Sequence, residues 1–363
     1  MAPRFPFSKA VPNARGMTSE SPLRLRLDGE ALAANWRALA RLSGSAACGA
    51  AVKADGYGVG AAPTIKRLAR EGCRDFFVAT WIEAAALGEW DETLALSVFH
   101  GVREADMHAA LASPARPCLS TPGQVRRWRE AAGGPCDVMV DTGMNRLGLS
   151  AEEVAAGLLD GLEIITLMSH LACADEPENP MNARQRDVLA ALKGKVAAQR
   201  LSLANSAGVA LGAEYAFDLT RPGLSLYGGI QVDALAPHIR QIVFPEAQVV
   251  QRRAIGPGDS VGYGGTFVAT RDMQMAILNI GYADGYFRGF SGCGRAFAGE
   301  AECPVIGRVS MDLIAVCADA APDLAEGDWL AIDFDLRAAS AQSGVSQYEL
   351  LTGLGARYQR QWI

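Results

Sequence analysis

Lysine is scarce in this chain, and several features that mark common classes of protein are missing. Only five of the 34 basic residues are lysines, and the net charge is −6. No basic stripe with interleaved aromatic residues occurs, which argues against nucleic acid as a partner. No apolar run reaches the length of a bilayer span, which argues against a membrane partner. Half of the residues are hydrophobic, so the chain can build a sizeable core.

Cysteine spacing gives no sign of a metal site or of a disulfide framework. The eight cysteines are scattered, without a C-x-x-C pair and without a matching histidine pattern. In a chain without a secretory leader, such residues are most often buried free thiols. Residues 1–21 carry basic residues but no apolar signal-peptide core. We therefore expect no metal, a disordered extension over residues 1–21 with Met1 or Met17 as the start, and a cytoplasmic protein.

Between residues 48 and 227 the chain alternates short apolar runs with alanine-rich amphipathic stretches. The intervening stretches carry helix signals, such as Pro122 at the first position of a helix. No G-x-G-x-x-G follows the first run, which weakens a dinucleotide-binding interpretation. Eight strand–helix units predict an α/β fold, a (β/α)8 TIM-type barrel over residues 22–232. The expected strands are 48–52, 75–79, 94–98, 117–120, 136–140, 164–169, 201–204 and 223–227.

After Gly229 the texture of the sequence changes. Helical periodicity fades, and clusters of Gly, Pro and Asp separate short β-rich runs. This pattern predicts a second, mainly antiparallel β domain over residues 233–363. The run Leu23–Leu27 alternates cleanly between apolar and basic residues, and we expect it to pair with the β domain rather than with the barrel.

Polar residues fall where the predicted barrel strands end, which is where barrels carry their chemistry. Lys53 closes the first strand, residues 141–146 follow the fifth, His170 closes the sixth and Arg221 leads into the eighth. A lysine beside buried apolar surface can act as the nucleophile that forms a Schiff base. A strand-end lysine can also simply extend to solvent, and a strand-end histidine or a rim arginine can be structural.

Ser206 follows the seventh predicted strand and lies near Gly223 of the eighth. Barrels frequently bind phosphate there, on backbone N–H groups at a helix N-terminus. A plain helix cap is the other interpretation of Ser206. A Schiff-base lysine that faces a phosphate site in one barrel mouth predicts pyridoxal 5′-phosphate as the cofactor.

Eight motifs, taken in order across both predicted domains, resemble those of alanine racemases. The resemblance runs from about residue 23 to the C-terminus. It implies a barrel followed by a β domain, and a pyridoxal-phosphate enzyme that interconverts L- and D-alanine for peptidoglycan. It also implies a homodimer with shared active sites. The motifs are Val52–Gly58, Asp141–Gly148, His170–Glu176, Ala204–Ala207, Arg221–Gly228, Gly262–Gly264, Ile280–Gly285 and Gly307–Asp312.

The resemblance implies a catalytic role for four residues. Lys53 would hold the cofactor as a Schiff base and act as one catalytic base. Tyr263 from the other subunit would be the second base, on the opposite face of the substrate α-carbon. A tyrosine has an ordinary pKa of about 10, so it needs help to act as a base near neutrality. His170 would give that help, and Arg221 would face the pyridine nitrogen and keep the ring unprotonated.

The resemblance also implies binding residues around the cofactor and the substrate. Tyr57, Ser206 and the backbone of Gly223 and Leu224 would bind the phosphate. Arg146 would lie near the substrate carboxylate. Met311 would hold that carboxylate through its backbone, with Asp312 beside it, both from the second subunit. The substrate passage would be lined by Tyr282, Arg288 and Asp175.

The chain departs from the family pattern at a few positions. Many members carry a carbamylated lysine two residues before Asp141, where this chain has Met139, which cannot form a carbamate. Our hypothesis is that an anion holds Arg146 instead, and a direct pairing of Arg146 with a protein carboxylate would overturn it. Near the C-terminus a phosphate-binding tyrosine of some members falls on Ala356, with Tyr358 displaced, and we assign neither to phosphate.

Alternative functions stay open at this point. Related racemases accept serine or larger amino acids, and the sequence does not give the width of the passage. Pyridoxal-phosphate decarboxylases of diamino acids share the barrel and the lysine, but they need an acidic pocket for which no motif is present. A single-domain cofactor carrier lacks the second domain. A cofactor-free Schiff-base aldolase would not be yellow.

Overall fold

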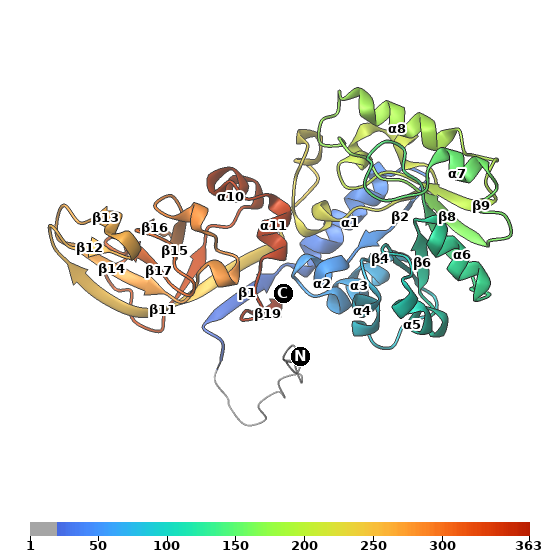
Figure 1. Cartoon of the computed structure of the whole chain (residues 1–363). Helices are drawn as coiled ribbons and strands as arrows, with labels where there is room; N and C mark the ends of the chain where they lie inside the picture. Colours follow the sequence, from blue (N-terminus) through green and yellow to red (C-terminus); the bar gives the residue numbers. More distant parts are fainter. Residues whose placement is uncertain (1–19) are drawn as a thin grey trace, which may run out of the picture.

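The structure, a computed structural model, describes residues 20–363 and consists of a helix-covered barrel and a β domain (Figure 1). Residues 1–19, which hold most of the predicted extension, lie outside the described residues. Among residues 20–363, no helix is both long and apolar enough to cross a membrane. Strands β1 and β19 lie between the barrel and the rest of the β domain, and the long strand β11 runs from there to the far end of the β domain, on the left of Figure 1.

The barrel is closed by parallel strands in the order β2-β10-β9-β8-β7-β6-β5-β4-β3. Strands β2 and β3 are two halves of one strand interrupted at Gly49, so eight strand positions form the ring. The predicted (β/α)8 barrel is thus confirmed. Its strands are β2 (Ala47–Cys48), β3 (Ala50–Ala51), β4 (Asp75–Val78), β5 (Ala95–Val98), β6 (Arg116–Leu119), β7 (Cys136–Met139), β8 (Ile164–Met168), β9 (Ala198–Ser202) and β10 (Leu219–Thr220).

Helices cover the outside of the barrel (Figure 1). Their local signals are those of the sequence: Pro122 is the first residue of its helix, and the side chain of Thr121 caps it by accepting from Gln124 N. The helices are α1 (Gly29–Leu42), α2 (Lys53–Tyr57), α3 (Ala61–Arg70), α4 (Trp81–Ala86), α5 (Met107–Ala112), α6 (Pro122–Glu130), α7 (Ala151–Ala155), α8 (Pro180–Ala190) and α9 (Ala213–Ala216).

Two expected strands were wrong or misplaced. Residues 223–227 are not a strand: the eighth strand is β10, and the 3-10 helix η3 (Leu224–Tyr227) follows it, with every residue buried. A short buried apolar run fits a strand and a helical turn equally well. The seventh strand runs over 198–202 rather than 201–204. This strand contains the polar Arg200, which points into the barrel and forms an ion pair with Asp75 at 2.7 Å. A polar residue at this position is therefore compatible with a strand and does not indicate a loop.

The β domain is a sheet that closes on itself because β11 pairs with β18 through its first half and with β14 through its second. These pairs are antiparallel, as expected. Its elements are β11 (Val243–Ile255), β12 (Ser260–Val261), β13 (Phe267–Val268), β14 (Met273–Leu278), β15 (Arg295–Ala298), β16 (Ala301–Ile306), β17 (Ile314–Cys317), β18 (Trp329–Ile332), α10 (Leu336–Ser343), α11 (Gln347–Thr352) and β19 (Gln359–Trp362).

The first strand of the chain belongs to this second sheet. β1 (Leu23–Leu27) is antiparallel to β11 and parallel to β19, which confirms the expected pairing. Its three leucines are fully buried, while Arg26 is exposed. The range 22–232 assigned to the barrel therefore includes one strand that is hydrogen-bonded into the other domain. The division between residues 232 and 233 stays a prediction.

Candidate active site

A cavity of about 600 Å³ opens at the carboxyl ends of the barrel strands. It brings together four of the predicted residues, from four different strand ends: Lys53, Arg146, His170 and Arg221. Apolar side chains, two further basic residues, one serine and one aspartate complete its wall. The lining is Lys53, Ala79, Phe99, His100, Arg103, Met139, Val140, Asp141, Met144, Arg146, Leu147, Ser169, His170 and Arg221.

Lys53 is presented by a left-handed turn. Ala54, Asp55 and Tyr57 have φ of 53°, 50° and 54°, and each such residue costs roughly 1–2 kcal/mol. Side chains hold the turn in place. Glu83 accepts the N–H of Ala54 at 2.9 Å, and the Asp55 carboxylate accepts the N–H of Ala61 at 2.8 Å. Backbone strain of this kind persists only where the surroundings fix it, and it is common at functional sites.

The Lys53 amine faces the cavity with a lowered pKa. Partial removal from water lowers this pKa most, the positive charge of Arg146 lowers it further, and Glu83 opposes the effect. A lowered pKa leaves more of the amine neutral near pH 7 and therefore nucleophilic. The structure thus gives this lysine the electrostatic setting of a Schiff-base former.

Arg221 and His170 lie at the floor of the cavity. Arg221 is only 4% exposed and donates to the carbonyl of Ser169 at 2.6 Å and to the hydroxyl of Ser202. Burial lowers the pKa of Arg221 to about 10, which still leaves it charged at neutral pH. Removal from water, followed by the charges of Arg221, Arg146 and Lys53, lowers the pKa of His170 to about 3. His170 is therefore neutral at pH 7.

The residues predicted to bind phosphate lie together and are buried, and none of them is among the residues that line the cavity. The Ser206 hydroxyl accepts the N–H groups of Gly223 and Ser225 at 2.9 and 3.2 Å. The Tyr57 hydroxyl lies so close to Gly223 that a Cβ on this glycine would be 2.2 Å from it. Leu224 follows as the first residue of η3. Ser206 is not a helix cap, because the side chain of Asn205 accepts the N–H of Gly208.

Five predicted residues, Tyr263, Met311, Asp312, Tyr282 and Arg288, lie on the β domain and do not line the barrel cavity of this chain. Tyr263 is 70% exposed and Met311 53% exposed, unusual values for large apolar side chains. Tyr263 borders a separate hollow of about 780 Å³ on the β domain. Arg288 lies over the ring of Tyr282 at 5.2 Å, and Asp175 is exposed on the barrel.

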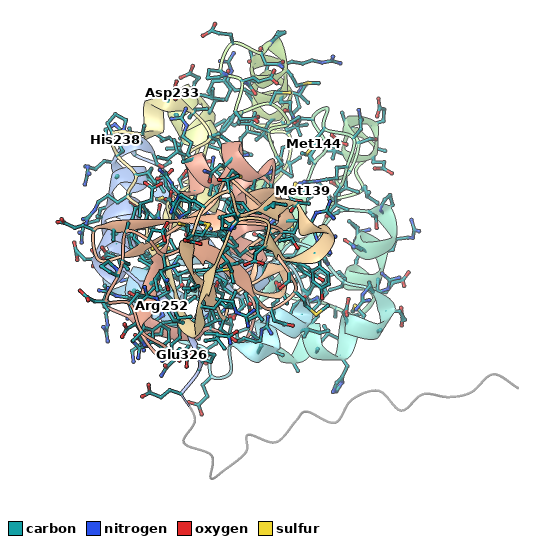
Figure 2. All side chains as sticks on the ribbon, turned by 90° about the vertical axis from the view of Figure 1, so that its left-hand side faces the viewer. Met139, Met144, Asp233, His238, Arg252 and Glu326 are labelled. Atoms are coloured by element: carbon teal, nitrogen blue, oxygen red, sulfur yellow. The ribbon has the colours of Figure 1, made fainter. Side chains whose placement is uncertain are left out.

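Met139 and Met144 lie in the same wall of the cavity (Figure 2). In the part of the chain that the structure describes, Arg146 forms no ion pair with a carboxylate. The arrangement that would have overturned the anion hypothesis is therefore not found there. That hypothesis stays a prediction.

Tyr348 of α11 was not predicted as a site residue, although it lies against Tyr57. Its ring centroid lies 6.3 Å from that of Tyr57, and its hydroxyl donates to Gln231 at 2.9 Å. Burial, and then the charge of Asp175, raise the pKa of Tyr348 to about 12. No spacing signal could have found it, because almost 300 residues separate it from Tyr57. His100 and Arg103 in the cavity wall were missed as well. Tyr358 is buried at 5% exposure.

This chain is similar to known proteins over nearly its whole length. The alanine racemase N-terminal domain family matches residues 27–231, and the alanine racemase C-terminal domain family matches residues 242–362. Alanine racemase from Acidiphilium cryptum is 41% identical over 349 residues, which are 93% of this chain and 97% of that protein. The biosynthetic alanine racemase from Agrobacterium fabrum is 37% identical over 370 residues, 95% and 94% of the two chains.

Solved structures show the same architecture. Alanine racemase from Bartonella henselae, described with covalently bound pyridoxal phosphate, is 32% identical and has a TM-score of 0.87 over 95% of this chain and 100% of that chain. The biosynthetic alanine racemase from Pseudomonas aeruginosa is 28% identical, with a TM-score of 0.85 over the same shares. With both family domains matched in order, the chain belongs to the alanine racemase family.

Proposed function

We propose that this chain is a pyridoxal-phosphate-dependent alanine racemase that interconverts L- and D-alanine with two bases. One observation carries the proposal: Lys53 and Arg221 line one cavity in the barrel mouth, and Tyr57 and Gly223, which follow them closely in the chain, meet each other and Ser206. A related enzyme, from Bartonella henselae, has pyridoxal phosphate covalently bound. The same architecture and 41% identity to a curated relative support the same chemistry here.

The residues present fit this cofactor. The group around Gly223 offers the hydroxyls of Tyr57 and Ser206, with the N–H groups of Gly223 and Ser225 gathered on the Ser206 oxygen, and none of these residues is a carboxylate that would repel a phosphate. Arg221 is permanently charged at neutral pH and bonded only to a carbonyl and a hydroxyl. Lys53 would hold the aldehyde carbon, Ser206, Tyr57, Gly223 and Leu224 the phosphate, and Arg221 the ring nitrogen.

When bound, pyridoxal phosphate accepts part of the electron pair left on the substrate α-carbon after proton removal. The protein then has to remove a proton from one face of that carbon and return one to the other. Lys53 is the base on one face, and Tyr263 of the partner subunit is the base on the opposite face. His170, neutral at pH 7, is an acceptor in position to assist the tyrosine. Arg221, unlike a carboxylate, does not protonate the ring nitrogen and so favours return of the proton over transamination.

We propose that the active enzyme is a homodimer with shared sites. The support is that Tyr263 and Met311 are exposed in one chain and lie on the β domain, away from Lys53. A second copy would bring Tyr263, Met311 and Asp312 of the partner subunit over the cavity. Met311 would hold the substrate carboxylate through its backbone, with Asp312 beside it, and Arg146 would bind the same carboxylate from the barrel. Tyr282, Arg288 and Asp175 would line the passage.

Alanine is a better substrate for this mouth than a diamino acid. The cavity wall carries six basic or imidazole side chains and one carboxylate, Asp141, which already accepts the N–H groups of Gly143 and Asn145. A distal ammonium would find no free acidic partner in that wall, which disfavours the decarboxylase alternative. A racemase that accepts serine remains the second candidate, because a hydroxyl adds little bulk.

Two further parts of the proposal concern the environment of Arg146 and the cellular location of the enzyme. We propose an anion between Met139 and Arg146, supported by the exposed and unpaired state of that guanidinium in the described chain. We also propose a cytoplasmic enzyme that supplies D-alanine for peptidoglycan. The support is that all eight cysteines are free thiols, as is usual in a reducing compartment, and that one relative is named biosynthetic.

The experiment is a coupled-oxidase assay for the D-enantiomer with L-alanine, L-serine and L-lysine as substrates. We expect turnover of L-alanine, little with L-serine and none with L-lysine. Lys53→Ala should abolish turnover and yellow colour, while the melting temperature of its apoprotein stays close to that of the parent apoprotein, because Lys53 is not part of the buried core. A colourless parent protein, or L-lysine as the preferred substrate, would refute the proposal.

A further inference from the structure

The last strand of the chain reaches the turn that carries Lys53. Arg360 of β19 donates from Nε to the carbonyl of Gly58 at 2.8 Å. Its Nη2 donates to the carbonyls of Gly355 and Leu354 at 3.2 and 3.3 Å. One guanidinium therefore joins the end of the barrel turn to the C-terminal segment, across 302 residues of sequence.

Other atoms of the C-terminal segment close around the same turn. Gly58 ends the turn with φ 84°, and a Cβ there would lie 2.4 Å from the carbonyl oxygen of Leu351 in α11. The ring of Tyr348, also in α11, is tilted against that of Tyr57. The β domain thus contacts this turn through backbone, an aromatic ring and a cation.

The turn needs such support because its backbone is strained. Ala54, Asp55 and Tyr57 are left-handed without being glycine, and such residues relax unless their surroundings hold them. The Glu83 carboxylate accepts the N–H of Ala54 at the start of the turn, and the Asp55 carboxylate accepts the N–H of Ala61 after it. The carbonyl at its end, on Gly58, is held by Arg360. Because the donor is charged, this bond is stronger than one between neutral groups.

We propose that Arg360 is a positioning residue: from the β domain it fixes the left-handed turn that presents Lys53 and Tyr57 to the cofactor. Affinity for pyridoxal phosphate then depends on the docking of the C-terminal strand. The identity of the cofactor rests on the proposed function, whereas the hold on the turn does not.

The first test needs no cofactor. Hydrogen exchange of residues 54–60 is measured in the apoprotein, where the N–H groups of Gly56, Gly58 and Gly60 bond to Val52, Ala54 and Asp55. Arg360→Ala should speed exchange roughly tenfold. Arg360→Lys keeps the positive charge but cannot reach Gly58 and the C-terminal carbonyls with separate nitrogens, so it should speed exchange less. The control is Arg26→Ala, an exposed arginine opposite Gln361 in the neighbouring strand. Equal exchange in Arg360→Ala and the control would overturn the proposal.

The second test titrates the apoprotein with pyridoxal 5′-phosphate and follows the visible absorbance of the lysine adduct. Arg360→Ala should weaken the apparent affinity roughly tenfold, with partial rescue in Arg360→Lys and no change in Arg26→Ala. For pyridoxal, which has no phosphate for Tyr57 to bind, the Arg360→Ala substitution should reduce the affinity less than it does for pyridoxal 5′-phosphate. An unchanged affinity for both aldehydes would contradict a positioning role.

The two proposals fail in different ways. A parent protein without racemase activity would refute the proposed function but would not affect the hydrogen-exchange test of Arg360. If Arg360→Ala does not fold, Arg360→Lys carries both measurements. Exchange in its residues 54–60 that is no faster than in Arg26→Ala then refutes the inference.

Discussion

Arg221 carries a buried charge that has no carboxylate partner among residues 20–363. It donates instead to a carbonyl and a hydroxyl at the barrel floor, and burial alone accounts for its lowered pKa. This arrangement leaves further donors free to face the cavity. A carboxyl group in the place of Arg221 would protonate the pyridine nitrogen of the proposed cofactor, whereas a guanidinium would not. Under the proposed function, this choice of residue would decide how long the α-carbon stays without its proton.

Arg221→Glu should therefore change the outcome of the reaction as well as its rate. We expect racemisation to slow on the order of a hundredfold, the size of effect seen when one electrostatic group is lost. The share of pyruvate formed per turnover should rise. Arg221→Lys, which keeps a positive charge, is the control and should not raise pyruvate. Kinetics identical to the parent in the glutamate variant would show that this role is wrong.

His170 should make the apoprotein acid-sensitive. Its pKa falls from 6.5 to about 3, mainly because it is removed from water and surrounded by cations. The unfolded chain then binds a proton below about pH 6.5 that the folded chain does not, so stability falls as the pH falls through this window. The loss from about pH 7.5 to about pH 5 should be on the order of 2 kcal/mol.

Urea unfolding of the apoprotein at the two pH values measures this effect. His170→Asn removes the titrating ring, so its stability should fall less between the two pH values, by about the same 2 kcal/mol. The other histidines are present in both proteins and cancel in the comparison. An equal pH dependence in both proteins would mean that His170 titrates normally.

At the scale of elements, the site depends on close backbone approach. Gly223 precedes η3 and lies against Tyr57, with the Ser206 hydroxyl on its N–H. The ring of Tyr57 is in turn stacked on Tyr227 of η3 at 4.7 Å. The left-handed turn and η3 therefore form one packed unit around the proposed phosphate position.

Gly223→Ala should weaken cofactor binding. A Cβ at this position would lie 2.2 Å from the Tyr57 hydroxyl, so the tyrosine must move. We expect the affinity of the apoprotein for pyridoxal 5′-phosphate to drop at least about tenfold, since each bond lost to a charged group is worth more than 1 kcal/mol. Gly134→Ala, where a Cβ meets nothing within 4 Å, is the matched control. Equal affinities for the two variants would contradict this packing.

Local patterns predicted most elements, and the two errors have different causes. The alternating Leu23–Leu27 was placed correctly in the second sheet because one apolar face needs a partner. Residues 223–227 were wrongly taken as a strand because a buried helical turn has no polar face to reveal its period. Arg200 was left outside its strand because its partner, Asp75, is distant in sequence.

At the scale of the molecule, the two bases of the proposed function do not meet within one chain. Lys53 lies in the barrel mouth, while Tyr263 is exposed on the β domain. The two domains are joined through β1, β11 and β19, and through contacts such as that of Arg360 with Gly58. Shared sites in a dimer would bring the two bases together.

Mixed dimers test this directly. Lys53→Ala and Tyr263→Phe should each be nearly inactive alone. After joint unfolding and refolding, half of the dimers are mixed, and each mixed dimer holds one intact site, so activity should recover to about a quarter of the parent. Mixing two preparations of Lys53→Ala is the control. Failure to recover, with mixed dimers shown by mass spectrometry, would place both bases in one chain.

The sequence by itself determined the barrel, the β domain and the family, because strand–helix alternation and local motifs are written in neighbouring residues. It also named Lys53, His170, Arg221 and Ser206, since each stands at a strand end. Only the tertiary structure decided that Tyr348 lies beside Tyr57, that Arg360 reaches Gly58 and that Tyr263 is exposed. Those contacts join residues hundreds of positions apart, and no local pattern encodes the distance between two packed domains.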